Sequence, residues 1–199
     1  MKRVLLSIIV LGLITAYATP KVAGQVGTSS SAQIPQTRLA GTFAVTTQGS
    51  NSACLKPDFS AFEDCTTPGA VTVQVNLVQA GQVFSDREGD SCGPFSVSFM
   101  PLGGSPALAT NTAVVVSKTT NYDPRTGTGD ATFKNYSAGS CDGAVFSPAP
   151  GAVVRISGTT HFVISSNGNR IDSIQTTRTE AQGPSDIGSF VISSVALRQ

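Results

Sequence analysis

The chain has 199 residues and a formal net charge of +1, and only 13% of its residues are charged, against about 25% in typical soluble domains. Its 13 Lys and Arg residues are scattered along the sequence. Nucleic acid and anionic membrane surfaces are therefore not expected as partners, because both are bound by clustered basic side chains. Hydrophobic residues make up 40% of the chain, which is too many for wholesale disorder and enough for one domain with its own core.

Residues 1–18 have the three parts of an export signal. The basic pair Lys2-Arg3 precedes an apolar run from Val4 to Ala16, and Ala16-Tyr17-Ala18 is a small-x-small cleavage site. A membrane-spanning helix is the alternative, but it needs about 20 apolar residues, and Thr19-Pro20-Lys21 ends the run early. We therefore predict a secreted or periplasmic protein with no stable membrane insertion after cleavage.

Residues 19–38 are predicted to be a flexible leader. They are rich in Gly, Ser, Gln and Thr without any period, as in Gly27-Thr28-Ser29-Ser30-Ser31, which is typical of linkers. A second plausible cleavage site, after Gly24, lies within this segment. Residues 39–199 are predicted to form a single β domain.

Apolar side chains alternate with polar ones along several segments of that domain. Val71, Val73, Val75 and Leu77 fall on one face of an extended chain and the residues between them on the other, which indicates a half-buried strand. No window has helical apolar spacing, so we expect at most one short helix, at Asp58–Asp64. Further strands are predicted around residues 43–45, 95–99, 114–116, 131–135 and 188–197.

A hairpin is predicted near the end of the chain. Asn167-Gly168 lies between two alternating runs and is a strong signal for a two-residue type I′ turn. That turn would place Ile164 opposite Ile171 and Val163 opposite Asp172.

The predicted fold is therefore an all-β antiparallel barrel of eight or nine strands, lipocalin-like by analogy alone. A β-sandwich is the alternative. An outer-membrane barrel is disfavoured because the chain has no Trp and three Tyr, too few for aromatic girdles.

The four cysteines allow three pairings, which the sequence does not separate. We favour Cys54 with Cys65 and Cys92 with Cys141, because the first link would close a short, Pro-containing excursion. There is no C-x-x-C pair and the spacing is irregular, so structural disulfides are favoured over a metal or redox site.

His161 is the only histidine, so any histidine-dependent mechanism would depend on it. The predicted register places His161 on the same face as Arg155 and diagonally across from Asp172, a carboxylate that could orient the imidazole as a general base. The same face carries Ser157 and Thr159, which favours an ordinary surface histidine.

Asp86, Glu88 and Asp90 place three carboxylates two residues apart around Gly89. Such oxygen ligands suit Ca²⁺, but the motif is not an EF-hand loop. A solvated turn is the favoured interpretation.

The phenylalanines of the predicted strands are candidates for the lining of an apolar pocket at the mouth of a barrel. The interior of an eight-stranded barrel is either filled by side chains or holds one small ligand. The candidates are Phe43, Phe95, Phe99, Phe133 and Phe162.

Three segments resemble a loose group of uncharacterised exported bacterial β proteins. They are Leu39-Ala40-Gly41-Thr42-Phe43, Gly127-Thr128-Gly129-Asp130-Ala131-Thr132 and the ending from Gly158-Thr159-Thr160-His161-Phe162 through Ile187-Gly188-Ser189-Phe190. The resemblance implies a β architecture and brings no activity or site.

The sequence thus predicts an exported, non-catalytic β-barrel that binds a small apolar ligand or a surface partner, with no cofactor. Two alternatives stay open. One is a cavity-based isomerase or hydrolase that uses His161, and the other is a structural or adhesive component of the cell envelope.

Overall fold

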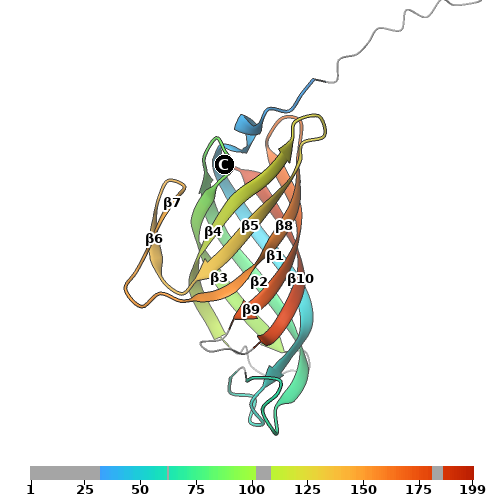
Figure 1. Ribbon diagram of the computed structural model, residues 1–199, viewed down its shortest axis with the longest axis vertical. Coiled ribbons are helices and arrows are strands. Elements are labelled where there is room, and N and C mark those ends of the chain that lie inside the picture. The colour runs from blue at the N-terminus through green and yellow to red at the C-terminus, as the bar shows by residue number, and fades with distance from the viewer. Residues whose placement is uncertain (1–31, 62, 102–108, 181–185) are drawn as a thin grey trace, which may run out of the picture. The chain divides into compact units, whose positions relative to one another are not determined.

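The computed structural model describes residues 32–61, 63–101, 109–180 and 186–199. The predicted signal and residues 19–31 of the predicted leader lie outside these ranges. Eight antiparallel strands close into a barrel (Figure 1). The all-β barrel predicted from alternation is confirmed, and the alternative β-sandwich is not formed.

The barrel strands follow one another around the wall in the order β1-β10-β9-β8-β5-β4-β3-β2. A separate hairpin interrupts the chain between β5 and β8, and a short 3-10 helix, η1, precedes β1. Within the described part of the chain, no helix is long and apolar enough to cross a membrane. The bounds are η1 (Gln36–Leu39), β1 (Gly41–Leu55), β2 (Val71–Ser85), β3 (Ser91–Pro101), β4 (Ala109–Asp123), β5 (Thr128–Tyr136), β6 (Gly139–Asp142), β7 (Val145–Pro148), β8 (Val154–Ile164), β9 (Arg170–Glu180) and β10 (Asp186–Arg198).

The interior of one half of the barrel is filled by apolar side chains. On β2, Val75 and Leu77 are fully buried while Gln74 and Val78 are exposed, as the period of two requires. Each large core side chain contributes about 1.5–3 kcal/mol through burial. The core comprises Ala53, Val75, Leu77, Phe95, Val97, Phe99, Ala113, Phe133, Ile156 and Ile192.

The β8–β9 hairpin has the predicted register, with Ile164 opposite Ile171 and Val163 opposite Asp172. The turn differs from the predicted type I′, which needs positive φ at both central residues. Gly168 has φ 75°, whereas Asn167 is not among the residues with positive φ. Instead, the Asn167 side chain accepts hydrogen bonds from the Ser165 hydroxyl and the Asn169 N–H. The register is unchanged because the observed loop between Ile164 and Ile171 has the same centre as the predicted two-residue turn.

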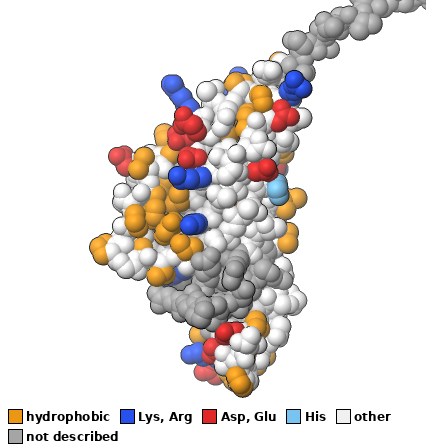
Figure 2. All heavy atoms as spheres, in the orientation of Figure 1, with side chains coloured by type: hydrophobic (Ala, Val, Ile, Leu, Met, Phe, Trp, Pro, Cys, Tyr) orange, Lys and Arg blue, Asp and Glu red, His pale blue; other side chains and the backbone are white. Residues whose placement is uncertain are grey.

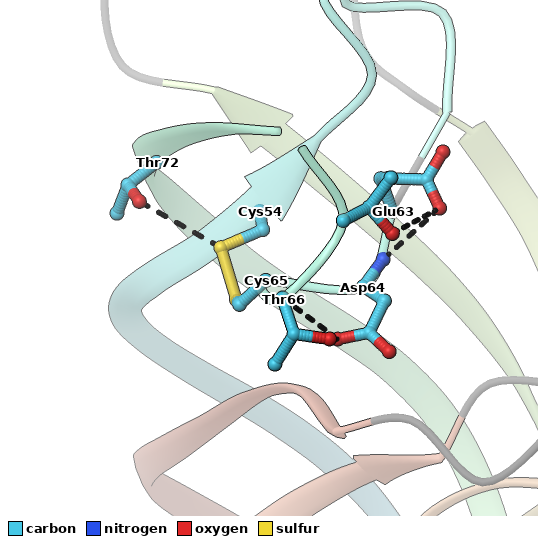
Figure 3. The surroundings of a disulfide bond; sticks show 7 residues. Cys54, Glu63, Asp64, Cys65, Thr66 and Thr72 are labelled. Carbon is cyan, nitrogen blue, oxygen red and sulfur yellow. Dashed lines mark hydrogen bonds between the residues drawn. A yellow bond between two sulfur atoms is a disulfide. The ribbon is translucent and has the colours of Figure 1, made fainter. Parts of the chain in front are cut away.

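The short helix expected at Asp58–Asp64 is not formed by the described residues of that segment, which consist of turns and bends. The Asp58 carboxylate accepts hydrogen bonds from both the N–H and the hydroxyl of Ser60, and such local bonds compete with helix formation. A disulfide between Cys54 and Cys65 closes the segment (Figure 3). This is the first of the two favoured pairings.

The β6–β7 hairpin lies outside the barrel and is tied to β3 by a disulfide between Cys92 and Cys141, the second favoured pairing. Its Phe146 ring packs on Tyr136 of β5, with centroids 4.4 Å apart. Val114 is 8% exposed although its neighbours on β4 place it on the outer face. Figure 2 shows hydrophobic side chains gathered on this side of the molecule. The hairpin therefore covers a second, smaller apolar cluster on the outside of the wall.

Candidate functional site

A cavity of about 140 Å³ occupies the half of the barrel that the core does not fill. It lies toward the end of the barrel that carries η1, and Leu39, the last residue of η1, is 3% exposed and lines it. The barrel is thus neither fully packed nor an open channel. It has a packed half and a hollow half.

Four of the five candidate phenylalanines line this cavity: Phe43, Phe95, Phe133 and Phe162. They come from β1, β3, β5 and β8, so apolar rings face the cavity from several sides of the wall. Phe99 lies elsewhere and lines a separate pocket of about 20 Å³ within the packed half. The other apolar residues that line the larger cavity are Val45, Val83, Val115, Ala131, Ile171 and Ala196.

The rest of the cavity wall is polar, whereas the predicted lining consisted of phenylalanines. Hydroxyl and carboxamide side chains occupy inward positions on every barrel strand, and no charged side chain is among the described residues that line the cavity. A bound molecule would therefore meet neutral hydrogen-bonding groups beside aromatic rings. The polar residues are Thr47, Gln79, Ser85, Ser91, Ser117, Thr119, Asn135, Thr160, Ser173, Gln175 and Ser194.

Some of these groups satisfy one another. Gln175 Nε2 donates to Ser194 Oγ at 2.6 Å, and Ser194 Oγ donates to Thr47 Oγ1 at 3.0 Å. The three residues lie on the adjacent strands β9, β10 and β1, which explains how their side chains meet. This part of the wall is a completed hydrogen-bond network.

The carboxamide side chains of Asn135 and Gln79 contain polar atoms without hydrogen-bond partners among the described residues. Asn135 is 1% exposed and Gln79 is 5% exposed, yet Asn135 Nδ2, Asn135 Oδ1 and Gln79 Nε2 have no hydrogen-bond partner among the described residues. Each buried, unpaired polar atom costs about 1–3 kcal/mol. Native proteins retain few such atoms, and those retained call for a functional or structural reason.

Alternation could have found both residues. Gln79 continues the inward series of Val75 and Leu77, and Asn135 continues that of Ala131 and Phe133. The predicted pocket lining consisted of phenylalanines alone, so the polar members of these series were left out of it. What alternation cannot supply is that the two residues border the same cavity.

The N-terminal segment and the last strand meet at the hollow end of the barrel. Arg198 donates hydrogen bonds to the carbonyl oxygens of Arg38, Ala40 and Gly168, at 2.6, 2.5 and 2.9 Å. Tyr122 Oη donates to the carbonyl of Ile34 at 2.9 Å. Segments far apart in the sequence are therefore joined over this end.

His161 lies on the outer face of the barrel, and 70% of its side chain is exposed. Its side chain is coloured pale blue in Figure 2. The Nδ1 atom of His161 lies 2.5 Å from Oδ1 of Asp130, the residue directly opposite on β5. Both residues border an open outer groove of about 590 Å³, not the internal cavity.

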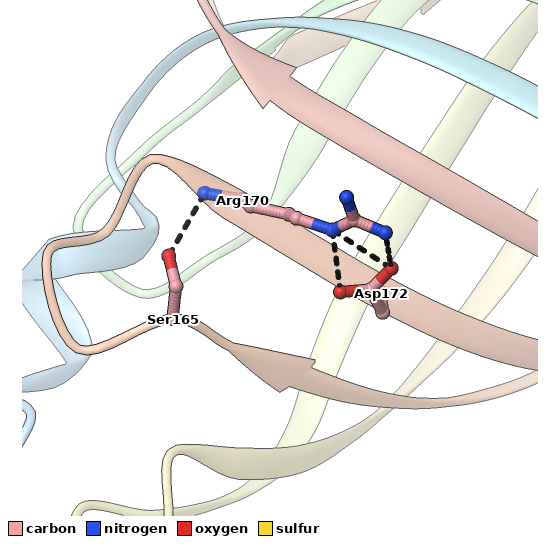
Figure 4. Close-up of polar contacts among 3 residues, drawn as sticks. All are labelled: Ser165, Arg170 and Asp172. Carbon is pink, nitrogen blue, oxygen red and sulfur yellow. Dashed lines mark hydrogen bonds and ion pairs between the residues drawn. The ribbon is translucent and has the colours of Figure 1, made fainter.

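Asp172 borders the same outer groove as His161, in the diagonal register that was predicted, whereas Arg155 does not border that groove. Asp172 is bound by Arg170, whose Nε and Nη2 both donate to its carboxylate (Figure 4). These bonds lower the pKa of Asp172 and raise that of Arg170. Arg155 is the extra residue of a β-bulge opposite Asn135 and Tyr136, and it lines the pocket of about 20 Å³, because a bulge redirects a side chain.

The acidic turn is held by its own hydrogen bonds. Asp86 Oδ1 accepts the N–H groups of Glu88 and Asp90, and Asp90 Oδ1 accepts the N–H of Thr119 at 3.0 Å. These carboxylates thus shape the β2–β3 turn. In the ranges that the structure describes, no group of three or more His, Cys, Asp or Glu could hold a metal ion.

Comparison with known proteins identifies no sequence family. No family model matches the chain, and no curated protein matches it. Among solved structures, the chain is similar to the S-type phycobiliprotein lyase CPES from Guillardia theta, with 11% identity, a TM-score of 0.30, and coverage of 82% of this chain and 90% of that one. A likeness this distant carries no information about function.

Proposed function

We propose that this protein is an exported, non-catalytic barrel that holds one small neutral molecule in its internal cavity. The observation that carries the proposal is the cavity itself, about 140 Å³ in volume and lined by aromatic rings together with hydroxyl and carboxamide groups. Proteins normally fill their interiors to close packing. A hollow of this size with unpaired polar atoms at its border is therefore better explained by a ligand than by folding.

The volume indicates the size of the ligand that fits inside the barrel. A cavity of about 150 Å³ lined by aliphatic and aromatic side chains is large enough to bind benzene. The ligand of this barrel is accordingly a molecule of about one ring. This modifies the predicted apolar ligand, because the cavity wall favours an apolar ring that carries polar groups.

The enzyme alternative has less support. The lone histidine faces solvent with 70% of its side chain exposed and pairs with Asp130, and the wall of the cavity offers no ionisable side chain among the described residues. General acid–base catalysis needs such a group within reach of the substrate.

Toluene is the probe that tests binding. We expect addition of toluene to the purified chain to raise the unfolding temperature and to shift amide resonances of cavity-lining residues such as Phe43 and Phe133. Ala131 lines the cavity and is 5% exposed, so Ala131→Leu should fill the space and abolish both effects. The absence of any effect on the parent chain would refute the proposal.

Export is the second part of the proposal. We propose that residues 1–18 are removed as a signal, that residues 19–38 form a leader and that residues 39–199 form the binding domain. The two disulfides suit an oxidising compartment. Intact-mass measurement of the protein from the host should find a chain that begins at Thr19 or Gln25, and an uncleaved Met1 would contradict this part.

A further inference from the structure

We infer that the ligand presents an amide-like edge, a carbonyl beside an N–H, to the side chain of Asn135. This inference rests on the proposed function and names the chemistry of the molecule that the cavity holds. The ligand class is a small neutral lactam or a related cyclic amide. Its apolar ring would lie against the phenylalanines.

The unpaired atoms define that edge. Asn135 offers an unpaired donor, Nδ2, and an unpaired acceptor, Oδ1. A carboxamide pairs with another cis-amide edge through two parallel hydrogen bonds, because each side presents one donor next to one acceptor. An alcohol, an ether or a hydrocarbon would satisfy at most part of this pattern.

Gln79 adds a second requirement. Its Nε2 is a further unpaired donor at the border of the same cavity, and it lies on β2, separated from Asn135 on β5 by β3 and β4. A ligand that reaches both residues therefore needs another acceptor on a different side of its ring.

The carboxamides can turn toward the ligand at little cost. The terminal torsions of Asn and Gln are broad, with no steep staggered wells. Asn135 borders both the large cavity and the small pocket beside it, so its amide group lies at the boundary between hollow and packed halves. Both of its amide atoms are buried when the cavity is empty, so the inference requires the side chain to turn toward the cavity as the ligand binds.

The uncharged lining and the volume of the cavity narrow the class of ligand. The described lining has no charged side chain, and a buried ion without a partner is strongly disfavoured. Carboxylic acids and amines are therefore poor ligands in their ionised forms. A single-ring lactam is neutral and matches the volume of about 140 Å³.

Titration calorimetry of the full chain with three probes separates the contributions of the N–H, the carbonyl and the apolar ring to binding. The probe 2-pyridone has a lactam edge, N-methyl-2-pyridone keeps the carbonyl but carries a methyl group in place of the N–H donor, and toluene has neither polar group. We expect 2-pyridone to bind about tenfold more tightly than its N-methyl derivative, as one buried hydrogen bond provides. Equal binding of the two pyridones would overturn the inference.

The variant Asn135→Leu tests whether Asn135 is the residue that recognises the lactam edge. The variant should lose the preference for 2-pyridone over N-methyl-2-pyridone and should bind toluene at least as tightly as the parent. The matched control is Asn121→Leu, because Asn121 is exposed on the outer face of β4. That control should keep the preference, and an Asn135→Leu variant that kept it would assign the lactam edge to the wrong residue.

A stability measurement without ligand keeps the inference testable if binding is weak. Replacing an unpaired buried amide by an apolar side chain of similar size removes a desolvation cost. Asn135→Leu should therefore unfold at a higher temperature than the parent, as expected for a residue kept for function. A lower unfolding temperature would mean that the amide is structural and would overturn the inference.

The outcomes of the titrations separate the two proposals. If toluene binds and neither pyridone does, the proposed cavity function stands and the lactam class is refuted. If no probe binds, the proposed function and the lactam class are both refuted, and the cavity holds water.

Discussion

The guanidinium of Arg198 lies over the ring of Phe43, with its central carbon 4.7 Å from the ring centroid. Phe43 lines the cavity from β1, and Arg198 ends β10, its neighbour in the barrel. The same guanidinium donates to carbonyls of the N-terminal segment and of the β8–β9 turn. One side chain thus joins the first strand, the last strand and a distant turn at the hollow end.

Arg198→Met should therefore weaken that end of the barrel. It removes three hydrogen bonds from a charged donor and a cation–π contact, so we expect a loss of about 2–4 kcal/mol in the free energy of unfolding. Arg198→Lys should recover little, because an ammonium lacks the planar fork that reaches three carbonyls. Urea denaturation measures both values. If toluene binds, its dissociation should also be faster in the Met variant, and unchanged stability would contradict the role given to Arg198.

Removal of the Cys92–Cys141 disulfide should release the outer hairpin. The bond closes a sequence separation of 49 residues, for which the entropic model gives a stabilisation of about 4 kcal/mol. Cys92→Ser with Cys141→Ser should make residues 139–148 sensitive to limited proteolysis. The cavity lies inside the barrel, so toluene binding should remain once the variant is folded.

The matched comparison is Cys54→Ser with Cys65→Ser. That bond has a separation of 11 residues, and the expected loss is about 3 kcal/mol. Proteolysis should then begin in residues 56–70 while the hairpin stays protected. The same cleavage pattern in both variants would show that the two disulfides do not act locally.

Alternation along single strands was enough to predict most of the fold. The inward series of β2 and the register of the β8–β9 hairpin depend on neighbouring residues, and both are as predicted. The pairing of β5 with β8 was beyond this reasoning because the β6–β7 hairpin separates these strands in the sequence. Asp130, which lies opposite His161 only through that pairing, was therefore missed, and Asp172 was chosen in its place.

The cavity was beyond sequence reasoning for a different reason. Whether a barrel interior is filled depends on the summed volume of all inward side chains and on the tilt of the strands. Small inward residues such as Ser173 and Ala196 lie on different strands, yet they border one cavity. The bulge that redirects Arg155 is likewise a property of two paired strands.

The contact between His161 and Asp130 should matter little for stability. Exposed pairs of this kind contribute about 0–1 kcal/mol because solvent screens them, and the two side chains are 70% and 43% exposed. A double-mutant cycle with His161→Ala and Asp130→Ala should give a coupling energy within that range, decreasing with added salt. Toluene binding should be the same in both single variants, since the pair lies on the outer face. Loss of binding in His161→Ala would revive the hypothesis that this histidine belongs to the functional site.

Alkaline pH should loosen the N-terminal segment through Tyr122. Burial, and to a smaller extent the nearby Asp123 carboxylate, raise the pKa of Tyr122 above its ordinary value of 10.0. The folded protein therefore holds the phenolic proton more tightly than the unfolded chain does, so this contribution to stability is complete below about pH 10 and declines as the pH rises toward the folded-state pKa. Ionisation also removes the donor of the hydrogen bond to Ile34.

Ultraviolet titration at 295 nm should thus find a tyrosine that ionises above pH 10, and Tyr122→Phe should remove that transition. The Phe variant should be about 1 kcal/mol less stable than the parent at neutral pH, and the difference should shrink above about pH 10 as the parent loses its own hydrogen bond. Amide exchange near Ile34 should accelerate over the same pH range in the parent and stay fast throughout in the variant. A difference that grew with pH would reverse the sign of the linkage and refute the role of the Tyr122 hydroxyl as the donor that anchors this segment.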